Sequence, residues 1–211
     1  MTSPGYSDRI NHAFVFAAKH HDRQVREGAR PPYLTHPANL AVMLTRYGQD
    51  EETVLAGILH DVVEDCARKP YTRDTMVTRV REKWGDRVLA DVLAVTQRAS
   101  DDEGNDLDAE ERKQDVLARL ATASDRARWV FAADQLHSAA SILADLRRTS
   151  FPEAVWGRLA SGRDGTIAGF RRAYERLQEV GFRAPILDEL RSTVETLERF
   201  ESENAARPAT R

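Results

Sequence analysis

Apolar residues recur every three or four positions along most of the chain, which is the period of an amphipathic helix. The first such segment has Ser7 where a helix N-cap is expected. Its apolar stripe consists of Ile10, Ala13, Phe14, Ala17 and Ala18. We find no run of alternating β-branched residues between turn residues, which is the pattern of a strand. The pattern therefore predicts an all-α protein.

Glycine and proline positions predict where these helices begin and end. The predicted helices span residues 7–23, 37–47, 51–65, 72–84, 86–97, 109–122, 125–148, 166–180 and 185–204. Residues 151–165 contain proline and glycine and are expected to form a loop. We expect one helical domain over residues 1–182. An amphipathic C-terminal helix at 183–204 would pack on that domain or on a partner, and residues 205–211 would form a flexible tail.

Composition narrows the class of protein. The 211 residues are 41% hydrophobic and 31% charged, which fits one globular domain. No apolar run approaches the roughly 20 residues that span a bilayer, and the N-terminus lacks a signal-peptide layout, so we expect a cytoplasmic protein without a membrane segment. A net charge of −3 argues against a nucleic-acid partner but allows a small anionic ligand. Because Cys66 is the only cysteine, any metal must be held mainly by histidine and carboxylate groups.

The segment at 51–65 carries the most informative chemistry. It is apolar on all sides before its last six residues, which include His60, Asp61, Glu64 and Asp65. At about 100° per residue, these four side chains fall on one side of the helix. Carboxylates that converge in an apolar setting repel one another unless a positive charge offsets them. A bound divalent cation would do so, and the alternative is an exposed helix end with solvated side chains.

Two further residues extend this candidate metal site. His36 stands directly before Pro37, at the expected entry to a helix, and Asp134 follows five apolar residues. A buried Asp134 without a partner would cost several kcal/mol. His36, His60, Asp61 and Asp134 together supply two imidazoles and two carboxylates. This mixed set suits Mn²⁺ or Fe²⁺, and Zn²⁺ is also compatible with it.

The order of these motifs resembles the HD superfamily of metal-dependent phosphohydrolases, and within it the Rel/Spo alarmone hydrolase domain. The similar segments are residues 24–37, the run His60-Asp61-Val62-Val63-Glu64-Asp65, and residues 132–137. Their order and spacing hold over about residues 8–145. Residues 156–172 more loosely resemble stand-alone bacterial small alarmone hydrolases. The resemblance implies a single compact helical HD domain with extra C-terminal helices.

The resemblance also implies an activity, hydrolysis of the 3′-pyrophosphate of guanosine tetra- or pentaphosphate with one Mn²⁺ ion. The implied metal ligands are His36, His60, Asp61 and Asp134. Glu64 and Asp65 would orient or deprotonate the attacking water. Arg26 looks like the loop arginine that packs on the base or faces the phosphates. Lys113, with Arg112, is similar to a basic pair that faces phosphates, and Ser138 stands at a substrate-facing position.

Some positions depart from the family pattern and leave alternatives open. Ser138 replaces an expected Asn, Glu27 a frequent Lys, and Ala168-Gly169 part of a frequent aromatic pair. An adenosine alarmone, a reduced dinucleotide phosphate or a nucleotide monophosphate therefore remains an alternative substrate. A non-catalytic nucleotide-binding regulator is a further alternative, although the retained Glu64 and Asp65 favour catalysis. We expect a small-molecule nucleotide as the main partner, leave a homodimer open, and expect His137 to be a packed core residue.

Overall fold

The computed structural model describes residues 6–26, 31–65, 71–101 and 103–205, except for the side chains of residues 65 and 201–205. These residues form ten α-helices and two isolated β-bridges in place of strands. The helices are α1 (Asp8–His20), α2 (Thr35–Arg46), α3 (Glu51–Asp65), α4 (Arg73–Trp84), α5 (Asp86–Val95), α6 (Ala109–Arg119), α7 (Asp125–Arg148), α8 (Pro152–Trp156), α9 (Gly162–Glu179) and α10 (Pro185–Ala205). The predicted all-α class is confirmed.

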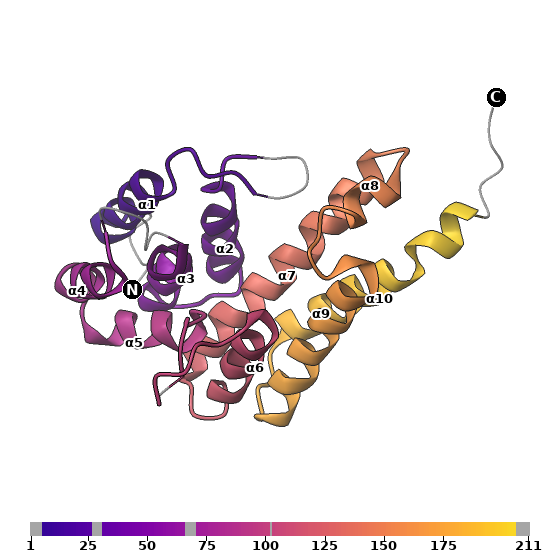
Figure 1. Cartoon of the computed structure of the whole chain (residues 1–211). Helices are drawn as coiled ribbons and strands as arrows, with labels where there is room; N and C mark the ends of the chain where they lie inside the picture. The colour runs from indigo at the N-terminus through magenta and orange to yellow at the C-terminus, as the bar shows by residue number, and fades with distance from the viewer. Residues whose placement is uncertain (1–5, 27–30, 66–70, 102, 206–211) are drawn as a thin grey trace.

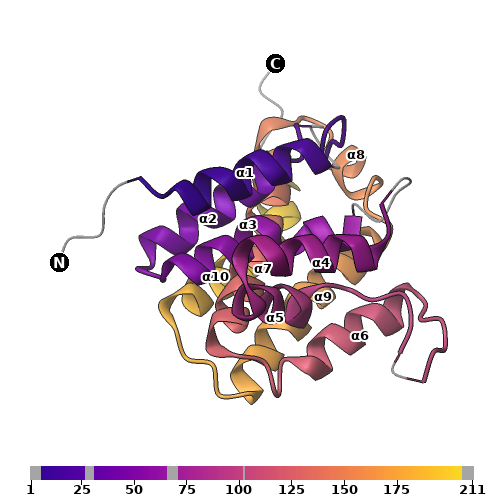
Figure 2. The ribbon, with the colours of Figure 1, turned by 90° about the vertical axis from the view of Figure 1, so that its left-hand side faces the viewer.

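Helix α3 lies at the centre of the N-terminal half of the molecule. Figure 1 shows it nearly end on, with α1, α2, α4 and α5 around it. Figure 2, a quarter turn away, shows α1 above α3 and α6 below α5. The helix is buried on all sides, as its apolar composition predicted; Leu55, Ile58 and Leu59 have no exposed surface.

A glycine lets α2 approach α3 closely. A Cβ atom at Gly57 would lie 2.6 Å from the Cδ1 atom of Leu44, whose side chain is fully buried in the core. A larger residue at this position would therefore require the Leu44 side chain to shift within the core. Because α2 carries His36 and α3 carries His60, the packing of these two helices brings both histidines to one place.

The longest helix, α7, connects the two halves of the fold. It packs against α2, α3 and α5 on one side and against α9 and α10 on the other. Figure 1 shows it running between the group around α3 and the group of α9 and α10. Asp134 lies near the middle of this helix, in a run of buried residues. The helix therefore places a carboxylate beside α2 and α3.

The C-terminal helix packs on its own chain. Leu187, Leu190, Val194 and Leu197 of α10 are buried against α7 and α9. The apolar face that left a homodimer open in the sequence is thus covered within the monomer. Ala205, predicted as the first residue of the tail, is the last residue of α10, and residues 206–211 lie outside the described part of the chain.

Several predicted helix limits are wrong by a few residues, and one loop is misassigned. Helix α2 begins at Thr35, so His36 lies inside its first turn. Residues 151–165 contain α8 and the start of α9, where a loop was expected. Pro152 occupies the first turn of α8, a position that tolerates proline, and burial of Val155 and Trp156 holds this short helix in place. None of the described helices combines the length and apolar composition that crossing a bilayer requires.

Candidate active site

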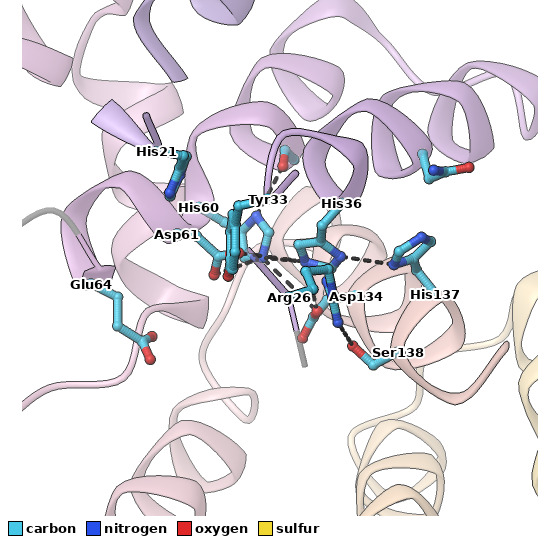
Figure 3. Close-up of polar contacts among 12 residues, drawn as sticks. His21, Arg26, Tyr33, His36, His60, Asp61, Glu64, Asp134, His137 and Ser138 are labelled. Carbon is cyan, nitrogen blue, oxygen red and sulfur yellow. Dashed lines mark hydrogen bonds and ion pairs between the residues drawn. The ribbon is translucent and has the colours of Figure 1, made fainter. Parts of the chain in front are cut away.

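The four predicted metal ligands converge from three helices. His36 comes from α2, His60 and Asp61 from α3, and Asp134 from α7 (Figure 3). The His36 Nε2 atom lies 3.4 Å from His60 Nε2 and 3.2 Å from Asp134 Oδ1. Asp61 Oδ1 lies 3.0 Å from His60 Nε2, and Asp61 Oδ2 lies 3.4 Å from His36 Nε2. One ligand atom each from His36, His60 and Asp134 fits within 4.8 Å of the others, which is the spacing of a metal site.

The charges at this cluster depend on one another. Both imidazoles are buried, with 2% of His36 and 5% of His60 exposed. Burial lowers the pKa of His60, but the Asp61 carboxylate outweighs it and raises the pKa to about 9. For His36 burial prevails over the opposing effect of Asp134, so its pKa is lowered. Burial alone would raise the pKa of Asp61, yet contact with His60 holds it well below its usual range. The cluster thus needs a positive charge between its carboxylates, which a proton or a cation can supply.

Each imidazole is oriented by its other ring nitrogen. His60 Nδ1 lies 2.9 Å from the carbonyl oxygen of Gly57, so this nitrogen donates and Nε2 faces the cluster. His36 Nδ1 lies 2.8 Å from His137 Nδ1. We expected His137 to be an ordinary core residue, and that expectation missed its contact with the His36 ring. The sequence feature that could have indicated this contact is the position of His137 three residues after Asp134, which places both residues on one face of α7.

Tyr33 is a site residue whose role the sequence did not reveal. Its hydroxyl donates a hydrogen bond of 2.7 Å to Asp61 Oδ2. Its ring stacks on His21, with centroids 4.5 Å apart. Tyr33 lies in the segment just before α2 and holds the Asp61 carboxylate in position by this hydrogen bond. The sequence could not reveal the contact, because no spacing rule along the chain links positions 33 and 61.

Glu64 lies one helical turn beyond His60 and apart from the four clustered side chains (Figure 3). Its Oε2 atom accepts a hydrogen bond of 2.8 Å from the backbone N–H of Gln97. The carboxylate also lines the same cavity as His60 and Asp61. Asp65 is the last residue of α3, and its side chain lies outside the described residues. Glu64 is therefore placed beside the cluster rather than in it.

A partly buried arginine fixes the backbone that holds Glu64. Arg119 of α6 donates to the carbonyl oxygens of Leu93 at 2.6 Å, Ala94 at 2.8 Å and Thr96 at 2.7 Å. These are the orphan carbonyls at the end of α5, which need donors from elsewhere. Asp115 accepts from Arg119 Nε at 2.9 Å and holds the guanidinium in position. The segment that carries the Gln97 N–H is thereby tied to α6.

The cluster opens into a cavity of about 380 Å³. All three predicted substrate-binding residues, Arg26, Lys113 and Ser138, line it. Arg26 Nη2 donates to Ser138 Oγ at 3.2 Å, and Lys113 Nζ donates to Ser161 Oγ at 3.3 Å. Arg112, the other half of the basic pair, donates from Nε to the carbonyl of Leu107 and does not line this cavity. The structure thus separates the two members of that pair.

Comparisons with known proteins agree with this geometry. A family model described as HD domain matches residues 13–167. A guanosine-3′,5′-bis(diphosphate) 3′-pyrophosphohydrolase of Aquifex aeolicus is 36% identical over 94 residues, which are 44% of this chain and 12% of that protein. A GTP pyrophosphokinase of Myxococcus xanthus is 32% identical over 136 residues, 62% of this chain and 17% of that protein. The matching region thus spans less than a fifth of either relative.

A solved structure extends the likeness to nearly the whole chain. It is that of a metazoan ortholog of SpoT that hydrolyses ppGpp, with a TM-score of 0.70 and 24% identity, covering 93% of this chain and 98% of that chain. At this identity the likeness shows the fold. An HD domain implies a divalent metal, and the cluster of His36, His60 and Asp134 provides ligand atoms for one. With its model matched over residues 13–167, the chain belongs to the HD domain family.

Proposed function

We propose that the protein is a Mn²⁺-dependent pyrophosphohydrolase that removes the 3′-pyrophosphate from guanosine tetra- or pentaphosphate. The observation that carries the proposal is the convergence of His36, His60 and Asp134 at a cavity that Glu64 and Arg26 also line. The names of the curated relatives, which include a guanosine-3′,5′-bis(diphosphate) 3′-pyrophosphohydrolase, support the choice of substrate.

His36, His60, Asp61 and Asp134 would hold the ion. Two imidazole nitrogens and two carboxylates form a mixed set that suits Mn²⁺, with Fe²⁺ and Zn²⁺ as competitors. When bound, a divalent ion supplies Lewis-acid polarisation of a phosphate and lowers the pKa of water. The Nδ1 atom of His60 is hydrogen-bonded to the Gly57 carbonyl and that of His36 to His137, and these contacts would keep both Nε2 atoms directed toward a bound ion.

Glu64 would serve as the general base, with Asp65 as its neighbour in moving the proton. Water attacks the phosphorus attached to the ribose 3′ oxygen, and the bond between that phosphorus and the 3′ oxygen breaks. Glu64 takes the proton of the water, and the 3′ oxygen gains a proton as pyrophosphate leaves. The hydrogen bond from the Gln97 N–H fixes the position of the Glu64 carboxylate, and a general base must be held within reach of the water it acts on.

Arg26, Ser138 and Lys113 would bind the nucleotide. The Arg26 guanidinium lies 5.9 Å from the centroid of the Tyr33 ring and beside Ser138, on the loop side of the cavity. A planar guanidinium can stack on a base or pair with a phosphate. Lys113 stands on α6 as a point charge for a phosphate. Ser138 is shorter than the asparagine expected there, so it reaches less far toward a substrate.

A product screen tests the proposal. Metal-loaded protein would be incubated with guanosine and adenosine 3′-pyrophosphates, reduced dinucleotide phosphates and deoxynucleotide monophosphates, and released pyrophosphate and phosphate would be measured. We expect pyrophosphate from the guanosine alarmones and little product from the other compounds. Release of phosphate from a monophosphate, with no reaction of any alarmone, would overturn the assignment. Nucleotide binding without turnover of any compound would favour a regulator.

A further inference from the structure

A single peptide group connects Glu64 with a side chain of α6. The N–H of Gln97 donates to Glu64 Oε2 at 2.8 Å, and the carbonyl oxygen of Thr96 accepts from Arg119 Nη2 at 2.7 Å. These two backbone groups belong to the same peptide bond, which is planar and does not rotate freely. A shift of the Thr96 carbonyl therefore also moves the N–H that holds the Glu64 carboxylate.

Thr96 is also attached to the helix that carries two of the proposed metal ligands. Its hydroxyl shares its hydrogen between the carbonyl oxygens of Val92, at 2.8 Å, and His60, at 3.1 Å, and only 1% of the residue is exposed. Thr96 has extended backbone angles just past the end of α5, so helical hydrogen bonds do not extend to its carbonyl oxygen. Arg119 supplies the donor that this oxygen needs.

The Arg119 side chain is held in a fixed orientation. Asp115 Oδ2 accepts from Arg119 Nε at 2.9 Å, and Asp115 Oδ1 accepts from Arg98 Nη2 at 2.7 Å. Burial would raise the pKa of Asp115, but its bonds to Arg98 and Arg119 outweigh burial and lower the pKa. The carboxylate is therefore ionised at pH 7 and holds both guanidinium groups.

None of these three charged residues of the α6 side reaches the reaction directly. Arg98, Asp115 and Arg119 do not line the cavity that Glu64 and the metal cluster share. Any effect of Arg119 on the reaction must therefore pass through the backbone that it holds.

We propose that Arg119 is a positioning residue for the hydrolysis, because it fixes the Glu64 carboxylate through the peptide group between Thr96 and Gln97. The inference rests on the proposed function and deepens it. Glu64 takes the proton of the attacking water, and Arg119 keeps it within reach of that water. A misplacement of about 1 Å caused by a distant substitution can slow a reaction about 10²-fold, so the expected effect is on the rate of the chemical step.

Steady-state kinetics of Arg119 variants tests this role. In Arg119→Gln we expect kcat for guanosine 5′-diphosphate 3′-diphosphate to fall about 10- to 100-fold, while KM stays within about twofold and Mn²⁺ content is unchanged. Arg119→Lys keeps the charge but not the planar set of donors, so it should recover part of kcat. The matched control is Arg183→Gln. Arg183 donates to the carbonyl oxygens of Gln178 and Phe182 near the end of α9 and does not line the cavity, so kcat should stay within about twofold.

A double-mutant cycle separates positioning from a general loss of structure. If Arg119 acts through Glu64, then Arg119→Gln should change kcat by less than about twofold in a Glu64→Gln background, since the group that it positions has already lost its basicity. An equal loss of kcat in both backgrounds would overturn the role. A rise in KM with an unchanged kcat would also overturn it.

Hydrogen exchange measured by NMR tests the contact without any substrate. In Arg119→Gln the Gln97 amide should exchange at least about tenfold faster than in the wild type, whereas the Ala132 amide, inside α7, should keep its rate. Faster exchange at Gln97 supports the proposal even if another nucleotide of the panel proves to be the compound hydrolysed. Equal Gln97 rates in Arg119→Gln, Arg183→Gln and the wild type would overturn it while leaving the proposed hydrolase activity intact.

Discussion

The Nδ1 atoms of His36 and His137 lie 2.8 Å apart, so one of the two rings carries a hydrogen there and the other accepts it. Burial and the nearby charges of His36 and Arg26 lower the pKa of His137 to about 4, so His137 is neutral at pH 7. His36 Nε2 faces Asp134 and His60. When that nitrogen binds a cation, its lone pair is used, and Nδ1 of His36 must be the donor. His137 is then the acceptor that orients a metal ligand.

Loss of this acceptor should weaken metal binding. We expect His137→Phe to lower affinity for Mn²⁺ by about 10- to 100-fold, the usual effect of removing a partner of a metal ligand. His137→Gln retains an acceptor and should recover part of the loss. Competition with a fluorescent chelator measures both. The control is His12→Phe, since His12 is exposed and lies against Trp84. Equal affinities in the His12 and His137 phenylalanine variants would rule out this role.

Metal should stabilise the fold as well as support activity. One ion would join the proposed ligands from α2, α3 and α7, and an ion present at 100 times its Kd adds about 2.7 kcal/mol to the free energy of unfolding. For a chain of this size, chelation should lower Tm by about 5–10 °C, and Mn²⁺ should restore it. Asp134→Ala should show no shift with Mn²⁺, whereas Asp125→Ala, exposed at the start of the same helix, should shift as the wild type does. Full activity and unchanged Tm after exhaustive chelation would contradict the prediction.

Metal affinity should depend on pH in a defined direction. His60 Nδ1 is bonded to the Gly57 carbonyl, so the proton lost on titration is the one on Nε2, where the ion would bind. With a pKa of about 9 in the metal-free protein, this proton competes with the ion at lower pH. Affinity for Mn²⁺ should therefore rise about tenfold per pH unit up to about pH 9 and then level off.

A variant tests the cause of this pH dependence. The Asp61 carboxylate is what raises the pKa of His60 against the effect of burial. In Asp61→Asn the pKa of His60 should fall, so the affinity curve should level off at a lower pH even though affinity is weaker throughout. Calorimetric titration of Mn²⁺ in buffers with different heats of ionisation also measures how many protons are released when the ion binds. An affinity that does not vary between about pH 6 and 9 would show that no proton is displaced.

Glu64→Gln should separate chemistry from binding. The substitution keeps the size of the side chain and removes its basicity, so kcat should fall about 10²- to 10⁴-fold while metal content stays the same. Single-turnover kinetics and metal analysis of the purified variant test both parts. Glu82→Gln, an exposed substitution on α4, is the control and should leave kcat unchanged. If Glu64→Gln loses its metal, then Glu64 is a ligand and the four-residue metal set is wrong.

The sequence indicated the elements that carry the site. Helices α3 and α7 span the predicted residues 51–65 and 125–148, because their apolar periodicity and capping residues are local signals. The predicted loop at 151–165 was wrong, since Pro152 begins α8 and Gly162 begins α9. What stabilises α8 is burial of Trp156 in the core, and burial cannot be read from neighbours along the chain.

Residue types alone determined which side chains could bind a cation and act as a base, because two imidazoles and several carboxylates in apolar helices require partners. Only the tertiary structure decided which of them meet. The Nε2 atoms of His36 and His60 lie 3.4 Å apart because α2 packs on α3. The contacts of Tyr33 with Asp61, of Arg119 with the end of α5, and of α9 with the cavity join residues far apart in sequence. Such contacts arise from packing between helices, whereas the pattern along one chain reports only on the helix to which it belongs.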